Sequence, residues 1–478
     1  MVERKLKGIN PENVFKYFED ICSIPHGSGN TKLISDYLVK FAIEHNLKYI
    51  QDEINNVIIF ANGTKGYENH VPIILQGHMD MVCEKDNSSN IDMEKDGLEI
   101  NHNDEFVFAN GTTLGGDDGI AVAFILAILD DNTISHPPIE AIITVDEETG
   151  MDGAVFIDLS PIKSKTLINI DSEDEGIFTI SCAGGAKSTI HIPLEFEKAS
   201  GNKYVISIDG LSGGHSGTEI HKNRCNAIKL MGEILLNISE NSDLKIIELN
   251  GGAKDNAIPR SCYATIISNI NNIEEICSKI QDITKNQYDE PFINITAQNC
   301  QVYNDVALTK NCTNKIIDIL NIVPNGLIKW SDNIENLVET SLNLGVAKQE
   351  DKEIKLTFAV RSSVNEDKKN LIEKLKEISR EYNCIYTQKG EYPAWEYTDN
   401  SKIRTTFIDA YKKLYKKEPK IEAIHAGLEC GLLKEKIEGL DCISFGPQMH
   451  DIHTSREKLD IKSTERTFNL LKEVLKNL

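Results

Sequence analysis

Two histidines and several acidic residues stand in this sequence at positions where metal ligands would be useful. His78 and Asp80 follow the apolar run VPIILQG and are two residues apart, so their side chains project to the same side of an extended segment. The histidine could bind a metal while the aspartate accepts a hydrogen bond from the second ring N–H. Further candidates are Asp117 and Asp118 in GTTLGGDDG, Glu147 and Glu148 after IEAIITVD, Asp171 at the end of TLINID, and His453 beyond DCISFG.

Mixed imidazole and carboxylate ligands suit zinc, and also manganese or cobalt. The number of acids predicts two ions with one carboxylate bridging them, an arrangement used in hydrolysis. Tandem glutamates would allow one to bind metal while its neighbour remains free as a base. Asp118, which precedes the apolar stretch 120–129, is instead predicted to cap a helix.

All the candidates lie at the end of a predicted strand or at the start of a predicted helix. Continuous apolar runs indicate a mainly parallel sheet buried on both faces, and their alternation with helical segments predicts an α/β architecture flanked by helices. In open α/β sheets, ligand sites gather outside the carboxyl ends of the strands. We therefore expect the fold itself to bring the candidates together.

The chain is too long, at 478 residues, for one ordinary core. Near Cys182 the pattern changes to polar alternation, which indicates antiparallel strands, and a helix follows at CNAIKLMGEILLNI. The first pattern returns from about Pro393. We predict a catalytic domain of residues 1–185 and 393–478, interrupted by an inserted α+β domain of residues 186–392.

The net charge of −23 argues against nucleic acid and anionic membrane surfaces as partners. The N-terminal segment has charges throughout and lacks the apolar core of a secretory signal, and the stretch 120–129 is too short to span a bilayer. The 11 cysteines lie in apolar segments without C-x-x-C spacing, which predicts reduced, mostly buried thiols. We expect a cytoplasmic protein.

The motifs together resemble one family of enzymes. QGHMDMV, GTTLGGDDGIAVA, TVDEETGMDGA, INIDSEDEG, CAGG, GLSGGHSGTEIH, DNAIPR, IHAGLECG and GPQMHDIHTSREKL are similar to motifs of the aminoacyl-histidine dipeptidases, also called cytosolic non-specific or β-Ala-His dipeptidases. These belong to the dinuclear zinc peptidases, with carboxypeptidase G, aminoacylase and tripeptidase T. The resemblance implies hydrolysis of Xaa-His and other dipeptides with two divalent metal ions per chain, most often Zn²⁺. It also implies a homodimer whose inserted domain is a lid that mediates dimerisation.

The resemblance also implies a role for each candidate. The metal ligands would be His78 and Asp171 on one ion, Glu148 and His453 on the other, and Asp117 between them. Glu147 would be the general base that activates water, and Asp80 would orient His78. At the last ligand the family pattern usually reads His-Ser-Pro-Asp-Glu, whereas this chain has HTSRE, and His450 is a nearby competitor of His453.

Six further residues are candidates for binding the substrate: His215, Asn256, Arg260, Arg361, His425 and Glu429. In relatives, a lid histidine at the place of His215 helps to stabilise the oxyanion, often from the other subunit; without the resemblance it would be a loop histidine. The asparagine and the two arginines could hold substrate amide and carboxylate groups, but each arginine could equally form an ordinary salt bridge. His425 and Glu429 could line the pocket and hold the amino end of the substrate, or could be packed and hydrogen-bonded.

Two other functions fit parts of the pattern. The same dinuclear site would serve a deacylase of N-acyl amino acids or a tripeptidase, although GTTLGGDDG and HAGLECG favour the dipeptidase. A binding protein without catalytic activity is the second alternative, and the presence of every expected ligand and of Glu147 counts against it. The sequence has no G-x-G-x-x-G after a strand and no P-loop, and GGHSG is not a nucleophile elbow because its central residue is His.

Overall fold

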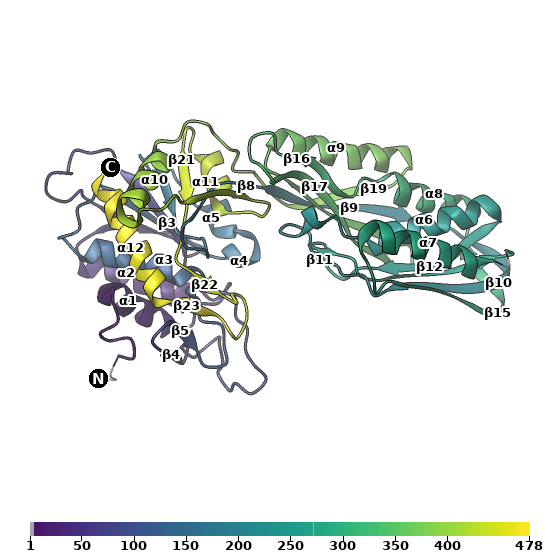
Figure 1. The fold of residues 1–478 in the computed structure, drawn as a ribbon, viewed down its shortest axis with the longest axis horizontal. Coiled ribbons are helices and arrows are strands. Elements are labelled where there is room, and N and C mark those ends of the chain that lie inside the picture. The colour runs from purple at the N-terminus through teal and green to yellow at the C-terminus, as the bar shows by residue number, and fades with distance from the viewer. Residues whose placement is uncertain (1–3, 271) are drawn as a thin grey trace. The chain divides into compact units, whose positions relative to one another are not determined.

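A computed structural model describes residues 4–270 and 272–478 of the chain (Figure 1). Contacts divide the chain into two compact units. Unit 1 contains residues up to Ser181 together with Tyr397–Ala423 and Leu428–Leu478, and unit 2 contains Cys182–Glu396 and Ile424–Gly427. The predicted insertion of residues 186–392 stays a prediction; unit 2 begins at Cys182, ends that stretch at Glu396 and also takes in Ile424–Gly427.

Unit 1 is built around an eight-stranded sheet of order β1-β2-β6-β3-β7-β21-β8-β20. Its strands are β1 Lys48–Gln51, β2 Val57–Ala61, β3 Ile73–His78, β6 Ile139–Thr144, β7 Thr166–Asn169, β8 Ile177–Cys182, β20 Lys420–Ile424 and β21 Asp441–Ser444. The four central strands β6, β3, β7 and β21 are parallel, whereas β1, β2 and β8 pair antiparallel with their neighbours. The α/β class is confirmed, and the sheet is mixed with a parallel centre.

The central strands are continuous apolar runs because both of their faces are covered. Every residue of β3 and β6 is buried. The helices of unit 1 are α1 Glu12–Cys22, α2 Lys32–Glu44, α3 Gly116–Asp130, α4 Glu147–Gly150, α5 Asp152–Phe156, α10 Lys402–Tyr415, α11 Glu429–Lys436 and α12 Ile461–Lys476. Residues 119–129 of α3 are buried all round, so this helix lies inside the unit.

Chain segments far apart in sequence meet in unit 1. A smaller sheet of order β22-β23-β5-β4 joins β4 Ile100–His102 and β5 Phe106–Ala109 to β22 Met449–His450 and β23 Lys458–Asp460. In Figure 1 the purple and blue N-terminal segments accordingly lie beside the yellow C-terminal segment. This pairing brings the loop after β22 to the sheet edge used by the first third of the chain.

Unit 2 has a nine-stranded antiparallel sheet of order β15-β10-β14-β12-β17-β18-β9-β19, with β16 paired to β17. The strands are β9 Gly184–Pro193, β10 Phe196–Asp209, β12 Leu244–Gly251, β14 Cys262–Ser268, β15 Asn294–Leu308, β16 Gly326–Trp330, β17 Val338–Gln349, β18 Glu353–Ser362 and β19 Ile385–Tyr392. Four helices join the sheet in one apolar core: α6 Ala227–Asn241, α7 Ile273–Tyr288, α8 Lys310–Ile322 and α9 Asn365–Glu381. A short ribbon pairs β11 Gly214–His215 with β13 Ala257–Ile258.

The cysteines and the apolar helices are the subject of two further expectations. Eight of the 11 cysteines are buried. Among the helices in the described part of the chain, none is long and apolar enough to cross a membrane.

Asn226 is expected to be a stability determinant of unit 2. It is 4% exposed, its Oδ1 accepts hydrogen bonds from the first backbone N–H groups of α6, and its Nδ2 donates to the carbonyl of Leu344 on β17 at 2.9 Å. Asn226→Ala removes a helix cap and buried hydrogen bonds, so we expect a loss of about 2–4 kcal/mol in the free energy of unfolding. Urea denaturation measures it. Asn237→Ala, on the outer side of the same helix, should change stability by less than about 0.5 kcal/mol; equal losses would contradict the assignment.

Candidate metal centre

The predicted ligands of unit 1 lie where the strands end. His78 is the last residue of β3, Glu147 opens α4 just after β6, and Asp171 follows β7 by two residues. Asp117 lies at the start of α3, and His453 follows β22. Because parallel strands place their carboxyl ends at one edge of the sheet, residues spread over almost 380 positions meet there.

The distances place Asp117 between two histidines. His78 Nε2 lies 3.1 Å from Asp117 Oδ1 and 3.9 Å from Asp171 Oδ1. His453 Nε2 lies 3.1 Å from Asp117 Oδ2 and 2.9 Å from Glu148 Oε1. Each oxygen of the Asp117 carboxylate therefore faces a different imidazole, which is the geometry that a carboxylate bridging two cations requires.

The donor atoms fit divalent cations. In three groups the possible ligand atoms lie within 4.8 Å of one another: His78, Asp118 and Asp171; His78, Glu147 and Glu148; Asp117, Glu148 and His453. Asp171 Oδ2 and Asp118 Oδ1 are buried and have no hydrogen-bond partner among the described residues. Buried carboxylate oxygens without a partner are costly unless a cation balances them. Imidazole and carboxylate donors together match zinc, manganese or cobalt.

The neighbouring carboxylates also favour positive charge on the two histidines, His78 and His453. Hydrogen bonds to the carboxylates of Asp117 and Glu148 raise the pKa of His453 to about 10. For His78, burial alone would lower the pKa, but the carboxylates of Asp117 and Asp80 outweigh it and raise the pKa well above its usual value. Each imidazole thus carries a proton that a metal ion would have to displace on binding, so metal affinity should fall at low pH.

Asp80 connects His78 to Glu147. The Nδ1 atom of His78 lies 3.0 Å from the backbone oxygen of Asp80 and 3.4 Å from its Oδ1. The same carboxylate accepts hydrogen bonds from Ser28 Oγ at 2.7 Å and from the backbone N–H of Glu147 at 3.1 Å. Burial, reinforced by neighbouring carboxylates, raises the pKa of Glu147 to about 8. One fixed aspartate therefore holds a candidate ligand and the candidate base in place.

The prediction that Asp118 caps a helix is wrong. Gly115, just before α3, has a left-handed φ of 68°, and Asp117 and Asp118 have non-helical backbone angles at a kink inside α3. This loop turns the fully buried Asp118 carboxylate towards β3, where it accepts a hydrogen bond from the backbone N–H of His78 at 3.1 Å. Gly77 makes room for it, since a Cβ there would lie 2.6 Å from Asp118 Oδ2. Sequence spacing gave no sign of this loop geometry.

His450, the competitor of His453, is used elsewhere. Its ring packs edge-on against Phe106, with 5.6 Å between ring centroids. Of the ligand groups found among the described residues, none includes it.

Glu429 is fully buried and hydrogen-bonded. Its Oε2 accepts hydrogen bonds from Gln76 Nε2 at 2.5 Å and from Thr144 Oγ1 at 2.6 Å, and Asn169 Nδ2 donates to Gln76 Oε1 at 2.6 Å. The other oxygen, Oε1, has no partner in the described part of the chain. The sequence pattern does not single out Gln76, Thr144 and Asn169, because single polar residues inside apolar strands resemble ordinary strand positions.

The remaining predicted residues belong to unit 2. His425 Nε2 lies 2.7 Å from Ser341 Oγ, and Arg361 Nη1 donates to the Tyr392 hydroxyl at 3.3 Å. Burial, together with the Arg361 cation, lowers the pKa of both His215 and His425, to about 3 for His425. Arg361 Nε and His425 Nδ1 are buried without a partner among described residues. This cluster of unit 2 therefore has hydrogen-bonding capacity left for a ligand.

The other two candidates of unit 2 lie on the neighbouring segments. Asn256 immediately precedes β13, and its backbone oxygen accepts a hydrogen bond from Ser216. Arg260 Nε donates to the carbonyl of Leu211 at 3.0 Å. Neither Arg260 nor Arg361 forms a salt bridge with any residue that the structure describes, so the ordinary ion-pair interpretation does not apply to them.

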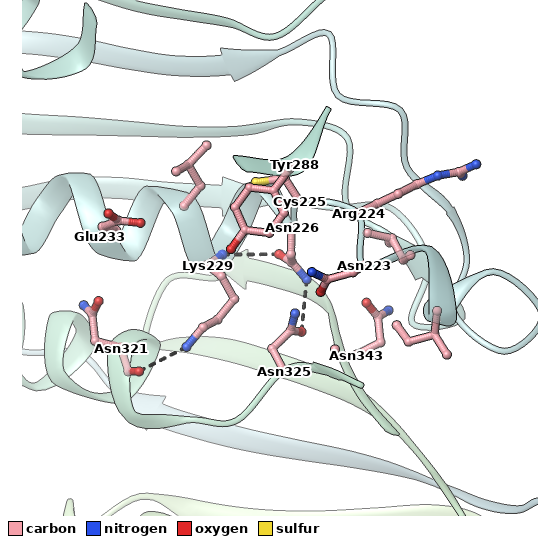
Figure 2. Close-up of a pocket in the computed structure, with 14 residues that line it drawn as sticks. Asn223, Arg224, Cys225, Asn226, Lys229, Glu233, Tyr288, Asn321, Asn325 and Asn343 are labelled. Carbon is pink, nitrogen blue, oxygen red and sulfur yellow. Dashed lines mark hydrogen bonds between the residues drawn. The ribbon is translucent and has the colours of Figure 1, made fainter. Parts of the chain in front are cut away.

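Unit 2 also contains a pocket of about 310 Å³ (Figure 2). Lys229 of α6 donates hydrogen bonds to the carbonyls of Asn321 and Val323 at the end of α8, and Asn226 Nδ2 donates to Asn325 Oδ1. Burial lowers the pKa of Lys229 to about 8. These polar side chains join α6, α8 and β17 to one another.

Comparison with known proteins shows the family to which the chain belongs. Residues 74–477 match the sequence profile of peptidase family M20/M25/M40. The chain belongs to this family of metallopeptidases. It is 36% identical over 480 residues to the cytosol non-specific dipeptidase of Escherichia coli (strain K12), covering 99% of both chains. Its fold matches that of the aminoacylhistidine dipeptidase from Vibrio alginolyticus with a TM-score of 0.92 and 33% identity, over 98% of this M20 chain and 97% of that one. Aminopeptidase PepT from Bacillus cereus shares the fold at a TM-score of 0.57 and 16% identity.

Glu429 should make the stability of the metal-free protein depend on pH. Burial raises its pKa to about 7, whereas an unfolded glutamate has about 4.3. The folded state therefore keeps a proton that the unfolded chain releases, and the resulting stability is complete below pH 4 and lost as pH rises through 7. Relative to wild type, Glu429→Gln should gain about 2–3 kcal/mol between pH 5 and pH 8. Urea unfolding with a chelator measures the difference. The surface variant Glu435→Gln should run parallel to wild type, and a Glu429→Gln difference independent of pH would refute the prediction.

Proposed function

We propose that the protein is a dipeptidase that uses two divalent metal ions. The observation that carries the proposal is the Asp117 carboxylate, whose two oxygens each face one imidazole. The full-length similarity to the dipeptidases of Escherichia coli and Vibrio alginolyticus supports the choice of dipeptides as substrates. Xaa-His dipeptides such as β-Ala-His, and other dipeptides more broadly, are the proposed substrate class.

The proposed ligands divide into two sets that share one residue. His78 and Asp171 would hold one ion, Glu148 and His453 the other, and Asp117 would contact both. Zinc is the proposed metal, with manganese and cobalt compatible with the same donors. Two bound ions would lower the pKa of a shared water and polarise the carbonyl of the scissile peptide bond.

Glu147 is the proposed general base and acid. Its carboxylate would take the proton of the attacking water and deliver it to the amine of the departing residue. Burial, which raises its pKa to about 8, supports this role because a group that holds and releases protons near neutral pH suits proton transfer. Asp80 would keep both His78 and the Glu147 backbone in position.

Six residues are proposed to bind substrate groups: His215, Asn256, Arg260, Arg361, His425 and Glu429. The unpartnered Arg361 Nε supports a role in holding a carboxylate, and His215 would donate to the oxyanion. The proposal includes a homodimer in which the inserted domain acts as lid and dimer contact. A cytoplasmic location is supported by the word cytosol in the name of the Escherichia coli relative. The net charge of −23 supports small peptides rather than nucleic acid as partners.

Removing the metal should abolish hydrolysis, and adding it back should restore it. The chelator-treated protein is titrated with zinc, manganese or cobalt, and turnover of carnosine, other Xaa-His dipeptides, Ala-Ala and Gly-Gly-Gly is measured. We expect activity to return at about two ions per chain, on dipeptides but not on the tripeptide. N-acetyl amino acids serve as the comparison substrates. Metal binding with turnover of only the acylated amino acids or the tripeptide would replace the dipeptidase assignment, and a chain without metal binding would refute the centre.

Glu147→Gln should separate catalysis from metal binding. Because Glu147 is proposed as base and not as ligand, the variant should keep about two ions while kcat falls by about 10²–10⁴-fold. Glu148→Gln is the matched comparison, since the neighbouring carboxylate is a proposed ligand and its loss should weaken one metal site. Elemental analysis after dialysis and steady-state kinetics on Ala-Ala measure both quantities. Unchanged kcat in Glu147→Gln would contradict the mechanism whatever the fold.

A further inference from the structure

Glu457 binds the backbone of the loop that carries Asp117. Its Oε2 accepts hydrogen bonds from the N–H groups of Leu114 at 2.7 Å and Gly115 at 3.1 Å. Its Oε1 accepts from Gly116 at 2.8 Å and, more weakly, from Asp117 at 3.4 Å. The side chain is 3% exposed. Consecutive N–H groups that converge in this way form a concave anion site, and here the anion is a carboxylate of the same chain.

The glycines of GTTLGGDDG allow this arrangement. Gly115 adopts a left-handed φ of 68°, which turns successive N–H groups towards one point. At Gly116 a Cβ would lie 3.1 Å from Glu457 Oε1, so a larger residue would crowd the carboxylate. The loop is therefore shaped around Glu457, and it ends at Asp117.

At its other end, Glu457 closes the turn that carries His453. The backbone N–H of Glu457 donates to the carbonyl of Thr454 at 3.1 Å, and Thr454 Oγ1 donates to the carbonyl of Asp451 at 2.7 Å. His453 itself has a left-handed φ of 57° within this turn. The sequence HTSRE lacks the proline of the family pattern, and these two hydrogen bonds hold the turn in this chain.

We propose that Glu457 is a positioning residue that sets the distance between His453 and Asp117. The two segments lie 340 residues apart in sequence, and the buried carboxylate joins them directly beside the proposed ligands. It contacts neither substrate nor metal and acts through the placement of His453. The inference rests on the proposed dinuclear centre, and it assigns to Glu457 the assembly of the metal site formed by Asp117, Glu148 and His453.

The carboxylate cannot be replaced by an amide without loss. Both oxygens of Glu457 accept hydrogen bonds, whereas the amide nitrogen of a glutamine is a donor and would face backbone N–H groups. Glu457→Gln should therefore release part of the loop and let His453 and Asp117 move apart. Residues that orient metal ligands typically change metal affinity by about 10–100-fold when they are replaced.

The test measures zinc binding by equilibrium dialysis and elemental analysis, independently of activity. Wild type is expected to bind about two ions, and Glu457→Gln should bind the ion proposed for Glu148 and His453 about 10–100-fold more weakly, with a smaller effect on the ion proposed for His78 and Asp171. In a His453→Ala background, Glu457→Gln should have little further effect on zinc affinity, because its action requires His453. Glu457→Gln with two sites of wild-type affinity would overturn the inference, and so would an additive loss in the double variant.

Glu140→Gln is the matched control. Glu140 on β6 is 5% exposed and likewise accepts backbone hydrogen bonds, from Lys163 and Ser164 at 3.0 Å. Its replacement should destabilise the protein and leave both zinc affinities unchanged, and a weakened zinc site in this control would overturn the specific role of Glu457. If Glu457→Gln does not fold, Glu457→Asp is tested in its place. Its carboxylate is one methylene shorter, so it should weaken the same zinc site. Wild-type zinc affinity in Glu457→Asp would refute the inference. Zinc binding absent from wild type would refute the proposed function itself.

Discussion

The desolvation of several carboxyl groups crowded at one edge of the sheet is the constraint on which unit 1 depends. Asp117, Asp118, Glu147, Glu148 and Asp171 all end close to one another at the edge of the sheet. Burial and the neighbouring acids raise the pKa of the Asp118, Glu147 and Asp171 carboxyl groups, so folding without cations must leave protons on this site. Two divalent ions would remove that cost, which ties metal binding to the stability of the fold.

A rigid scaffold is needed to hold so many like charges together. The central strands are buried on both faces, and their carboxyl ends cannot move apart without breaking the parallel hydrogen-bond ladder. Hydrogen bonds behind the centre add further restraint. Asp80 fixes the candidate base, the Glu429 carboxylate joins β3 to β6, and Glu457 fixes the glycine loop. The catalytic roles proposed for the side chains at the sheet edge therefore depend on the acids and amides that hold them in place.

In unit 2, some buried polar atoms have hydrogen-bond partners and others have none in the described part of the chain. Arg361 Nε and His425 Nδ1 are buried atoms that form no hydrogen bond to a described residue, whereas the polar groups around Lys229 are used in joining helices. Buried donors without partners are expensive in a protein that gains nothing from them. This contrast supports a ligand-binding role for Arg361 and His425 and a structural one for Lys229.

The sequence by itself determined the α/β class, the strand ends and the identity of residues able to bind metal. It could do so because apolar runs mark buried strands, and because parallel strands place the residues that follow them at one edge. Three features needed the tertiary structure. The direction of Asp118 depends on the glycine loop before it, the role of Glu457 depends on a contact across 340 residues, and the Gln76–Glu429 hydrogen bond lies between strand and helix. Local patterns encode which face a residue occupies, but backbone N–H groups that converge from a folded loop exist only after distant segments have packed.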